Sequence, residues 1–96
     1  MSPDKKKKLN QLRKHLDKLD NKLINLIKIR KNLVNEVIKQ KVFKKEIVDN
    51  KRIKIILNRI KKKSINKGID PKITNRIWKN MIWSFIDYEK RIFKKK

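Results

Sequence analysis

The chain has 96 residues, of which 38% are hydrophobic, and its formal net charge at pH 7 is +22. This length allows one small domain. The scarcity of turn residues, with only one Gly and two Pro, argues against an all-β fold, which needs a turn about every ten residues. The absence of Cys excludes a disulfide framework and a thiolate metal site, and a single histidine, His15, excludes a multi-histidine metal site.

The first part of the chain predicts one long amphipathic helix. Pro3 and Asp4 are typical of a helix start, and the helical pattern persists to about Gln40. Its apolar positions have alternating spacings of three and four, as in a helix packed along another helix. They are Leu9, Leu12, Leu16, Leu19, Leu23, Leu26, Leu33 and Val37. A helix from Lys5 to Gln40 would be roughly 54 Å long, more than the rest of the chain can cover, so we expect a second copy to cover the stripe.

Two shorter helices are predicted after a connecting loop at residues 42–48. The second helix begins at about Asp49 and ends before Gly68, the only Gly, which stands where a left-handed C-cap residue is needed. Asp70 and Pro71 are typical of the N-cap and the first position of a third helix. The sequence therefore predicts an all-α protein of three helices, long, short and medium.

The apolar faces of these two helices define the predicted core. They comprise Ile53, Ile56, Leu57 and Ile60 in the second helix, and Ile73, Ile77, Met81, Phe85 and Ile92, with Trp78 and Ile82 beside them, in the third. We expect a single domain over residues 1–96, with basic tails at about 1–7 and 94–96. No segment has the roughly 20 apolar residues of a membrane span, and no apolar stretch of a secretory signal follows the basic N-terminus, so we expect a cytoplasmic protein.

Three cations fall on or beside the apolar stripe of the first helix. Arg30 continues the stripe, Lys41 follows it at the helix end, and Arg13 borders it. Each has a purely structural alternative. Arg30 can set the register of a coiled coil, Lys41 can extend its ammonium from the helix end into water, and Arg13 can pair with Asp17 or Asp20 at helical spacing.

The second and third helices add charged residues at the border of the core. Asp49 and Arg52 share a face with Ile53, and Glu89 lies four residues after Phe85 on an otherwise apolar line. Asp49 can simply cap the second helix, and Glu89 can simply meet an interior cation. Burying a cation costs several kcal/mol, a large part of the about 5–15 kcal/mol that stabilises a domain. The surplus of interior cations therefore predicts a bound dianion, a small molecule with two carboxylates held by Arg side chains.

The ordered set of Arg, Arg, Lys, Asp and Arg resembles the all-helical, type II chorismate mutases over about residues 9–93. The segments that carry the resemblance are 12–20 (LRKHLDKLD), 23–30 (LINLIKIR), Lys41, 49–52 (DNKR) and 68–71 (GIDP). The resemblance implies an enzyme of aromatic amino acid biosynthesis. It also implies an intertwined homodimer with two sites, each of which binds chorismate. The implied reaction, the Claisen rearrangement of chorismate to prephenate, is pericyclic and needs no cofactor or metal. Catalysis would come from positioning and from cations at the ether oxygen.

The resemblance also implies a role for each candidate residue. Arg13 would reach the substrate from the partner subunit and bind one carboxylate, and Arg30 would bind the other. Lys41 would donate to the ether oxygen of the breaking C–O bond. Asp49 and Arg52 would position the ring and its hydroxyl.

Three positions differ from the pattern of the family. Glu89 stands where many members carry a Gln that donates to the ether oxygen, and only a protonated Glu can donate, so we expect activity to rise toward mildly acidic pH. Ile53 stands where many members have a Glu that contacts the ring hydroxyl, and Phe85 replaces a smaller polar residue. These departures keep an isochorismate-pyruvate lyase of the same fold open as an alternative.

Two readings without catalysis compete with an enzyme. A basic helical nucleic-acid-binding protein would concentrate its cations on one face, whereas here Lys is spread over all three helices, as A- and T-rich coding bias would produce. Trp78, Trp83 and Phe85 fall within one amphipathic helix, which favours a core role over base stacking. A coiled-coil scaffold would leave Arg30 and Glu89 on interior lines unexplained.

Overall fold

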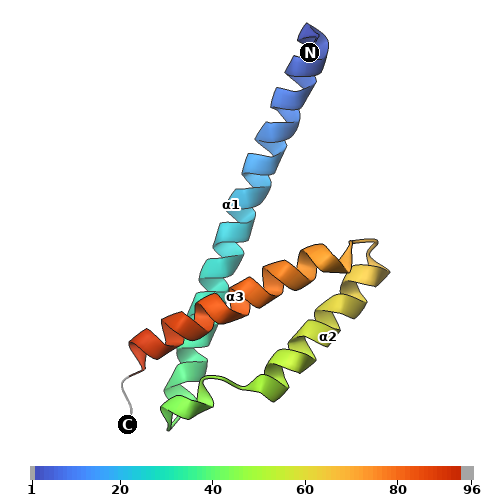
Figure 1. Cartoon of the computed structure of the whole chain (residues 1–96). Coiled ribbons are helices and arrows are strands. Elements are labelled where there is room, and N and C mark those ends of the chain that lie inside the picture. Colours follow the sequence, from blue (N-terminus) through green and yellow to red (C-terminus); the bar gives the residue numbers. More distant parts are fainter. Residues whose placement is uncertain (1, 94–96) are drawn as a thin grey trace. The chain divides into compact units, whose positions relative to one another are not determined.

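The computed structural model describes residues 2–93, which form three α-helices and one short 3₁₀ turn (Figure 1). The elements are α1 (Pro3–Gln40), η1 (Lys44–Glu46), α2 (Asn50–Asn66) and α3 (Pro71–Ile92). No residue from 2 to 93 lies in a strand. The predicted all-α fold with a long, a short and a medium helix is confirmed. The basic tail expected at 94–96 lies outside the described residues.

The chain divides into two compact units, residues 1–33 and residues 34–96. In the first unit, residues 3–33 form a single helix, which is the N-terminal part of α1. The predicted leucine stripe is uncovered within the chain: Leu12, Leu16, Leu19, Leu23, Leu26 and Leu33 are 49–62% exposed. A helix of 38 residues is about 57 Å long, so this stripe presents apolar surface along several turns.

The second unit has its own small apolar core, formed where the end of α1 and the loop after it meet α3. Its buried members are Ile38, Ile47, Ile82 and Ile86, and Val34, Val48, Ile53, Ile56, Leu57, Trp78, Ile92 and Phe93 pack against them. The apolar face predicted for α2 is therefore largely confirmed.

The apolar face predicted for α3 needs a correction. Ile73 and Ile77 are 55% and 52% exposed, whereas Ile86, which the sequence pattern did not single out, is only 4% exposed. The buried face follows Trp78, Ile82 and Ile86, one position and about 100° around the helix from the predicted line. Both faces of α3 are apolar in sequence, and only one of them is covered within the chain.

The turn between α2 and α3 has the geometry expected from its only glycine. Gly68 has φ of 71°, in the left-handed region. The amide of Ile69 donates to the carbonyl of Ser64 at 2.8 Å, and the amide of Gly68 donates to the carbonyl of Ile65 at 3.1 Å. This pair of bonds is the Schellman motif, which satisfies the last carbonyls of α2.

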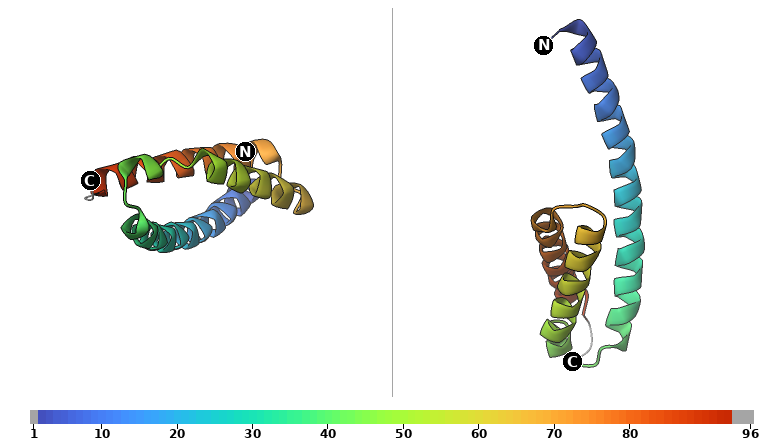
Figure 2. Two further views of the ribbon diagram at one scale, coloured as in Figure 1. Left: turned by 90° about the horizontal axis from the view of Figure 1, so that it is seen from below. Right: turned by 90° about the vertical axis from the view of Figure 1, so that its right-hand side faces the viewer.

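Helices α2 and α3 run side by side in opposite directions after this turn (Figure 2). Near the turn, the buried hydroxyl of Ser64 donates to the carbonyl oxygen of Ile60 at 2.6 Å. The same hydroxyl lies 2.7 Å from the hydroxyl of Thr74 on α3. Asp70 caps α3, as predicted, by accepting from the amide of Lys72 at 2.9 Å. Within residues 2–93, no helix has a stretch long and apolar enough to cross a membrane.

Candidate active site

The predicted site residues are distributed over both units. Arg13 and Arg30 belong to the first unit, and the other six belong to the second. Arg13 is exposed, and no ion pair within residues 2–93 joins it to Asp17 or Asp20, which disfavours the local pairing considered as an alternative. Arg30 is partly buried, whereas its neighbours on the stripe, Leu26 and Leu33, are exposed.

Lys41 immediately follows the end of α1, and its side chain is held by the loop after it. The ammonium Nζ donates to the carbonyl oxygen of Glu46 at 2.9 Å, and the backbone amide of Lys41 donates to the carbonyl of Ile38 at 3.1 Å. The residue is partly buried, so its ammonium does not simply extend into water. A lysine ammonium has three N–H donors, and Glu46 takes one of them. The other two can serve an anionic or ether oxygen.

The loop that holds Lys41 is ordered by Glu46 itself. Its carboxylate accepts from the amide of Val42 at 3.3 Å and from the amide of Phe43 at 3.4 Å. Ile47, next to it, is only 3% exposed and anchors the loop in the core. Sequence reasoning missed this arrangement and predicted only a connecting loop. The available signal was a Glu three residues after Phe43, the spacing at which a Glu side chain reaches back to an N-cap amide.

Asp49 and Arg52 stand at the beginning of α2 on its exposed side. Asp49 is the N-cap of the helix and accepts from the amide of Arg52 at 3.0 Å, so the capping role considered for it is confirmed. Such a cap contributes about 1 kcal/mol and leaves the second carboxylate oxygen for other partners. Ile53, one residue further, is half-buried and packs against the core.

Glu89 is the most unusual of the predicted residues because it is a carboxyl group in the interior. It is 7% exposed and, among residues 2–93, the one buried ionisable side chain. Burying a carboxyl group is costly unless it is paired or protonated, which makes this position a candidate for function. On the preceding turn of α3, Phe85 is half-buried, and its ring meets Tyr88 edge to face with centroids 6.4 Å apart.

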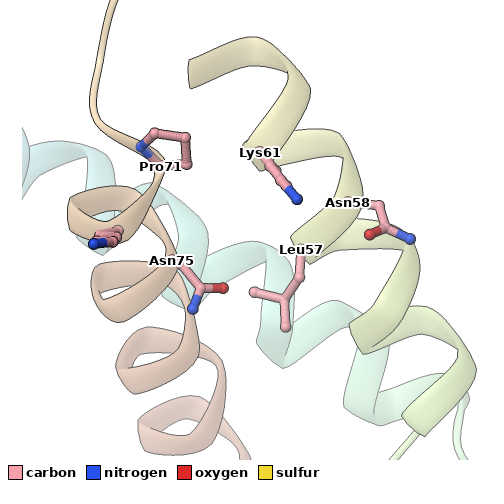
Figure 3. A pocket seen from close by; sticks show the side chains of 6 residues that line it. Leu57, Asn58, Lys61, Pro71 and Asn75 are labelled. Carbon is pink, nitrogen blue, oxygen red and sulfur yellow. The ribbon is translucent and has the colours of Figure 1, made fainter. Parts of the chain in front are cut away.

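A separate cavity of about 300 Å³ lies between α2 and α3 near their turn (Figure 3). Leu57 and Lys61 lie on its α2 side, and Pro71 and Asn75 lie on its α3 side. None of the eight predicted site residues lines it. The eight predicted site residues are therefore separate from this cavity.

Comparison with protein families identifies the chain. A family model described as chorismate mutase type II matches residues 12–90, which include all eight predicted site residues. Comparisons with curated proteins and with solved structures gave no match. The match covers most of the chain and agrees with its three-helix, all-α fold. The chain therefore belongs to the chorismate mutase type II family.

Proposed function

We propose that the chain is a chorismate mutase that converts chorismate to prephenate. The observation that carries this proposal is the family match over residues 12–90, within which the ordered set of cations and carboxyl groups falls. In this rearrangement the ether C–O bond breaks while a new C–C bond forms between two carbons of the same molecule. No protein atom bonds covalently to the substrate, so the protein contributes positioning and electrostatic stabilisation.

In this proposal three side chains act on the reacting part of the substrate. Arg30 binds a carboxylate, and Lys41 and Glu89 donate hydrogen bonds to the ether oxygen, on which negative charge builds in the transition state. The two N–H donors of Lys41 that Glu46 does not take, together with the burial of Glu89, support these roles. Asp49 and Arg52 orient the ring, and Ile53 and Phe85 form apolar walls beside it.

We further propose that the active form is a homodimer and that Arg13 acts on the substrate bound mostly by the partner subunit. The exposed leucine stripe of α1 and the exposed Ile73 and Ile77 of α3 support this. Fully burying an exposed leucine contributes about 1.5–3 kcal/mol, and burying these half-exposed side chains contributes a part of that each, so the stripe favours association. Association would also bring Arg13, which is exposed in the single chain, to a second copy.

The deciding experiment is to incubate the purified protein with chorismate and follow the loss of its ultraviolet absorbance, with prephenate as the product. Lys41→Ala should lower kcat by roughly 100- to 1,000-fold, or about 3–4 kcal/mol of activation free energy, by analogy with the loss of an oxyanion-hole donor. Lys39→Ala, an exposed lysine that pairs with Glu36 at 3.1 Å, is the matched control and should retain wild-type activity.

The same assay tests the lyase alternative. Ile53 and Phe85, which cannot hydrogen-bond a ring hydroxyl through their side chains, are the observation in its favour. Conversion of isochorismate to salicylate and pyruvate, with chorismate left unchanged, would replace the mutase by the lyase. Activity on neither substrate would refute both.

A further inference from the structure

We propose that Glu46 is a positioning residue for catalysis, which holds the ammonium of Lys41 in its working orientation. This inference rests on the proposed mutase function. Glu46 lies in η1, outside the set of residues that the sequence suggested, and it binds the Lys41 segment through both its main chain and its side chain.

The main chain of Glu46 contacts the side chain of Lys41 directly. The carbonyl oxygen of Glu46 accepts from Nζ of Lys41 at 2.9 Å in a partly buried setting. A lysine side chain has a flexible four-carbon stem, so an ammonium without such a partner would sample many rotamers. The contact selects one of these orientations before any substrate binds, and it leaves two N–H donors for other acceptors.

The carboxylate of Glu46 contacts the main chain directly after Lys41. It accepts from the amides of Val42 and Phe43, the two residues directly after Lys41. Together with the main-chain bond from the amide of Glu46 to the carbonyl of Phe43 at 3.0 Å, these bonds restrain the position of the carbonyl that holds Nζ. Ile47, buried next to Glu46, connects the whole turn to the core.

The contact between Glu46 and the Lys41 ammonium involves a carbonyl oxygen and not the carboxylate. Within residues 2–93, the carboxylate of Glu46 makes no ion pair with Lys41, because the ammonium is bound by the carbonyl instead. The ammonium of Lys41 is therefore held in place by a neutral carbonyl and not by an ion pair with the Glu46 carboxylate. Preorganised charge of this kind is what stabilises a developing negative charge, and a displacement of about 1 Å can cost roughly 100-fold in rate.

The test compares Glu46→Ala and Glu46→Gln with Glu36→Ala, an exposed carboxylate at the end of α1, as the control. Glu46→Ala should lower kcat by about 10- to 100-fold with little change in KM, because the substrate is still bound while Lys41 is displaced. Glu46→Gln should recover most of the activity, since its amide oxygen can still accept from Val42 or Phe43. Glu36→Ala should leave both constants unchanged. Equal kcat in Glu46→Ala and the wild type would overturn the proposal.

A double-mutant cycle separates positioning from a general loss of structure. In the Lys41→Ala background, Glu46→Ala should have no further effect on kcat, because Glu46 acts through Lys41. An undiminished further loss would assign Glu46 a purely structural role. Amide hydrogen exchange gives a readout without activity: Val42 and Phe43 should exchange faster in Glu46→Ala, and unchanged exchange would refute the loop contacts. An inactive wild type with this exchange difference would instead refute the mutase function.

Discussion

The hydroxyl of Tyr88 on α3 donates a hydrogen bond of 2.7 Å to Oδ1 of Asn35 on the last turns of α1. The two residues are 53 positions apart in the chain, and the bond is partly buried. Tyr88 directly precedes Glu89, and Asn35 lies six residues before Lys41. The bond therefore connects the end of α1, which Lys41 directly follows, with α3, which carries Glu89.

Removing this bond should lower stability measurably. Tyr88→Phe deletes only the hydroxyl and leaves Oδ1 of Asn35 without its donor, which should cost about 1–3 kcal/mol. The free energy of unfolding from urea titrations, at one fixed protein concentration, measures this cost. Ser84→Ala, an exposed change one turn earlier on α3, is the control and should stay within about 0.5 kcal/mol of the wild type. A Tyr88→Phe protein as stable as the control would show that the bond contributes nothing.

Gly68 gives a test of the turn between α2 and α3. A Cβ at this position would meet no atom within 4 Å, so Gly68→Ala would be penalised only by the positive φ of 71°. We expect a loss of about 1–2 kcal/mol in the free energy of unfolding. Gly68→Asn should lose less, because Asn adopts the left-handed conformation more readily than Ala. Equal losses in the two variants would indicate a cause other than backbone conformation.

Local signals in the sequence predicted the helices well, because caps and periodicity act over a few residues. Asp49, Gly68 and Asp70 stand at helix ends where their chemistry requires them. The choice between the two adjacent apolar faces of α3 depended on tertiary packing and was missed, as the burial of Ile86 shows. The role of Glu46 was missed as well, since hydrogen bonds within an irregular loop leave no periodic pattern.

The leucine stripe of α1 should decide whether the chain associates. Leu19 is 51% exposed in the single chain, so Leu19→Glu removes few contacts within the chain but places a charge in the proposed interface. We expect this variant to sediment as a monomer where the wild type sediments as a dimer, since an unpaired buried charge costs several kcal/mol. Asn21→Glu introduces the same charge at an exposed polar position of α1 and should remain dimeric. A monomeric wild type would contradict the proposed assembly.

Complementation between two inactive variants should reveal where Arg13 acts. If Arg13 serves the partner's site, a heterodimer of Arg13→Ala and Lys41→Ala has one site with both defects and one site with neither. Co-refolding the two variants in equal amounts should then restore about a quarter of the wild-type activity, because half of the dimers are mixed. If Arg13 serves its own chain, every site keeps one defect and the mixture stays as inactive as its components.

The buried carboxyl group of Glu89 should give the enzyme a pH dependence that its Gln variant lacks. Only the protonated form of Glu89 can donate to the ether oxygen, and the protonated fraction grows as the pH falls. The kcat of the wild type should therefore rise from neutral toward mildly acidic pH, whereas Glu89→Gln donates at every pH and should show a flatter profile. Asp87→Asn, an exposed carboxylate on the same turn, should keep the wild-type profile. If Glu89→Gln keeps the wild-type slope, another group causes the pH dependence, and Glu89 has no donor role at the ether oxygen.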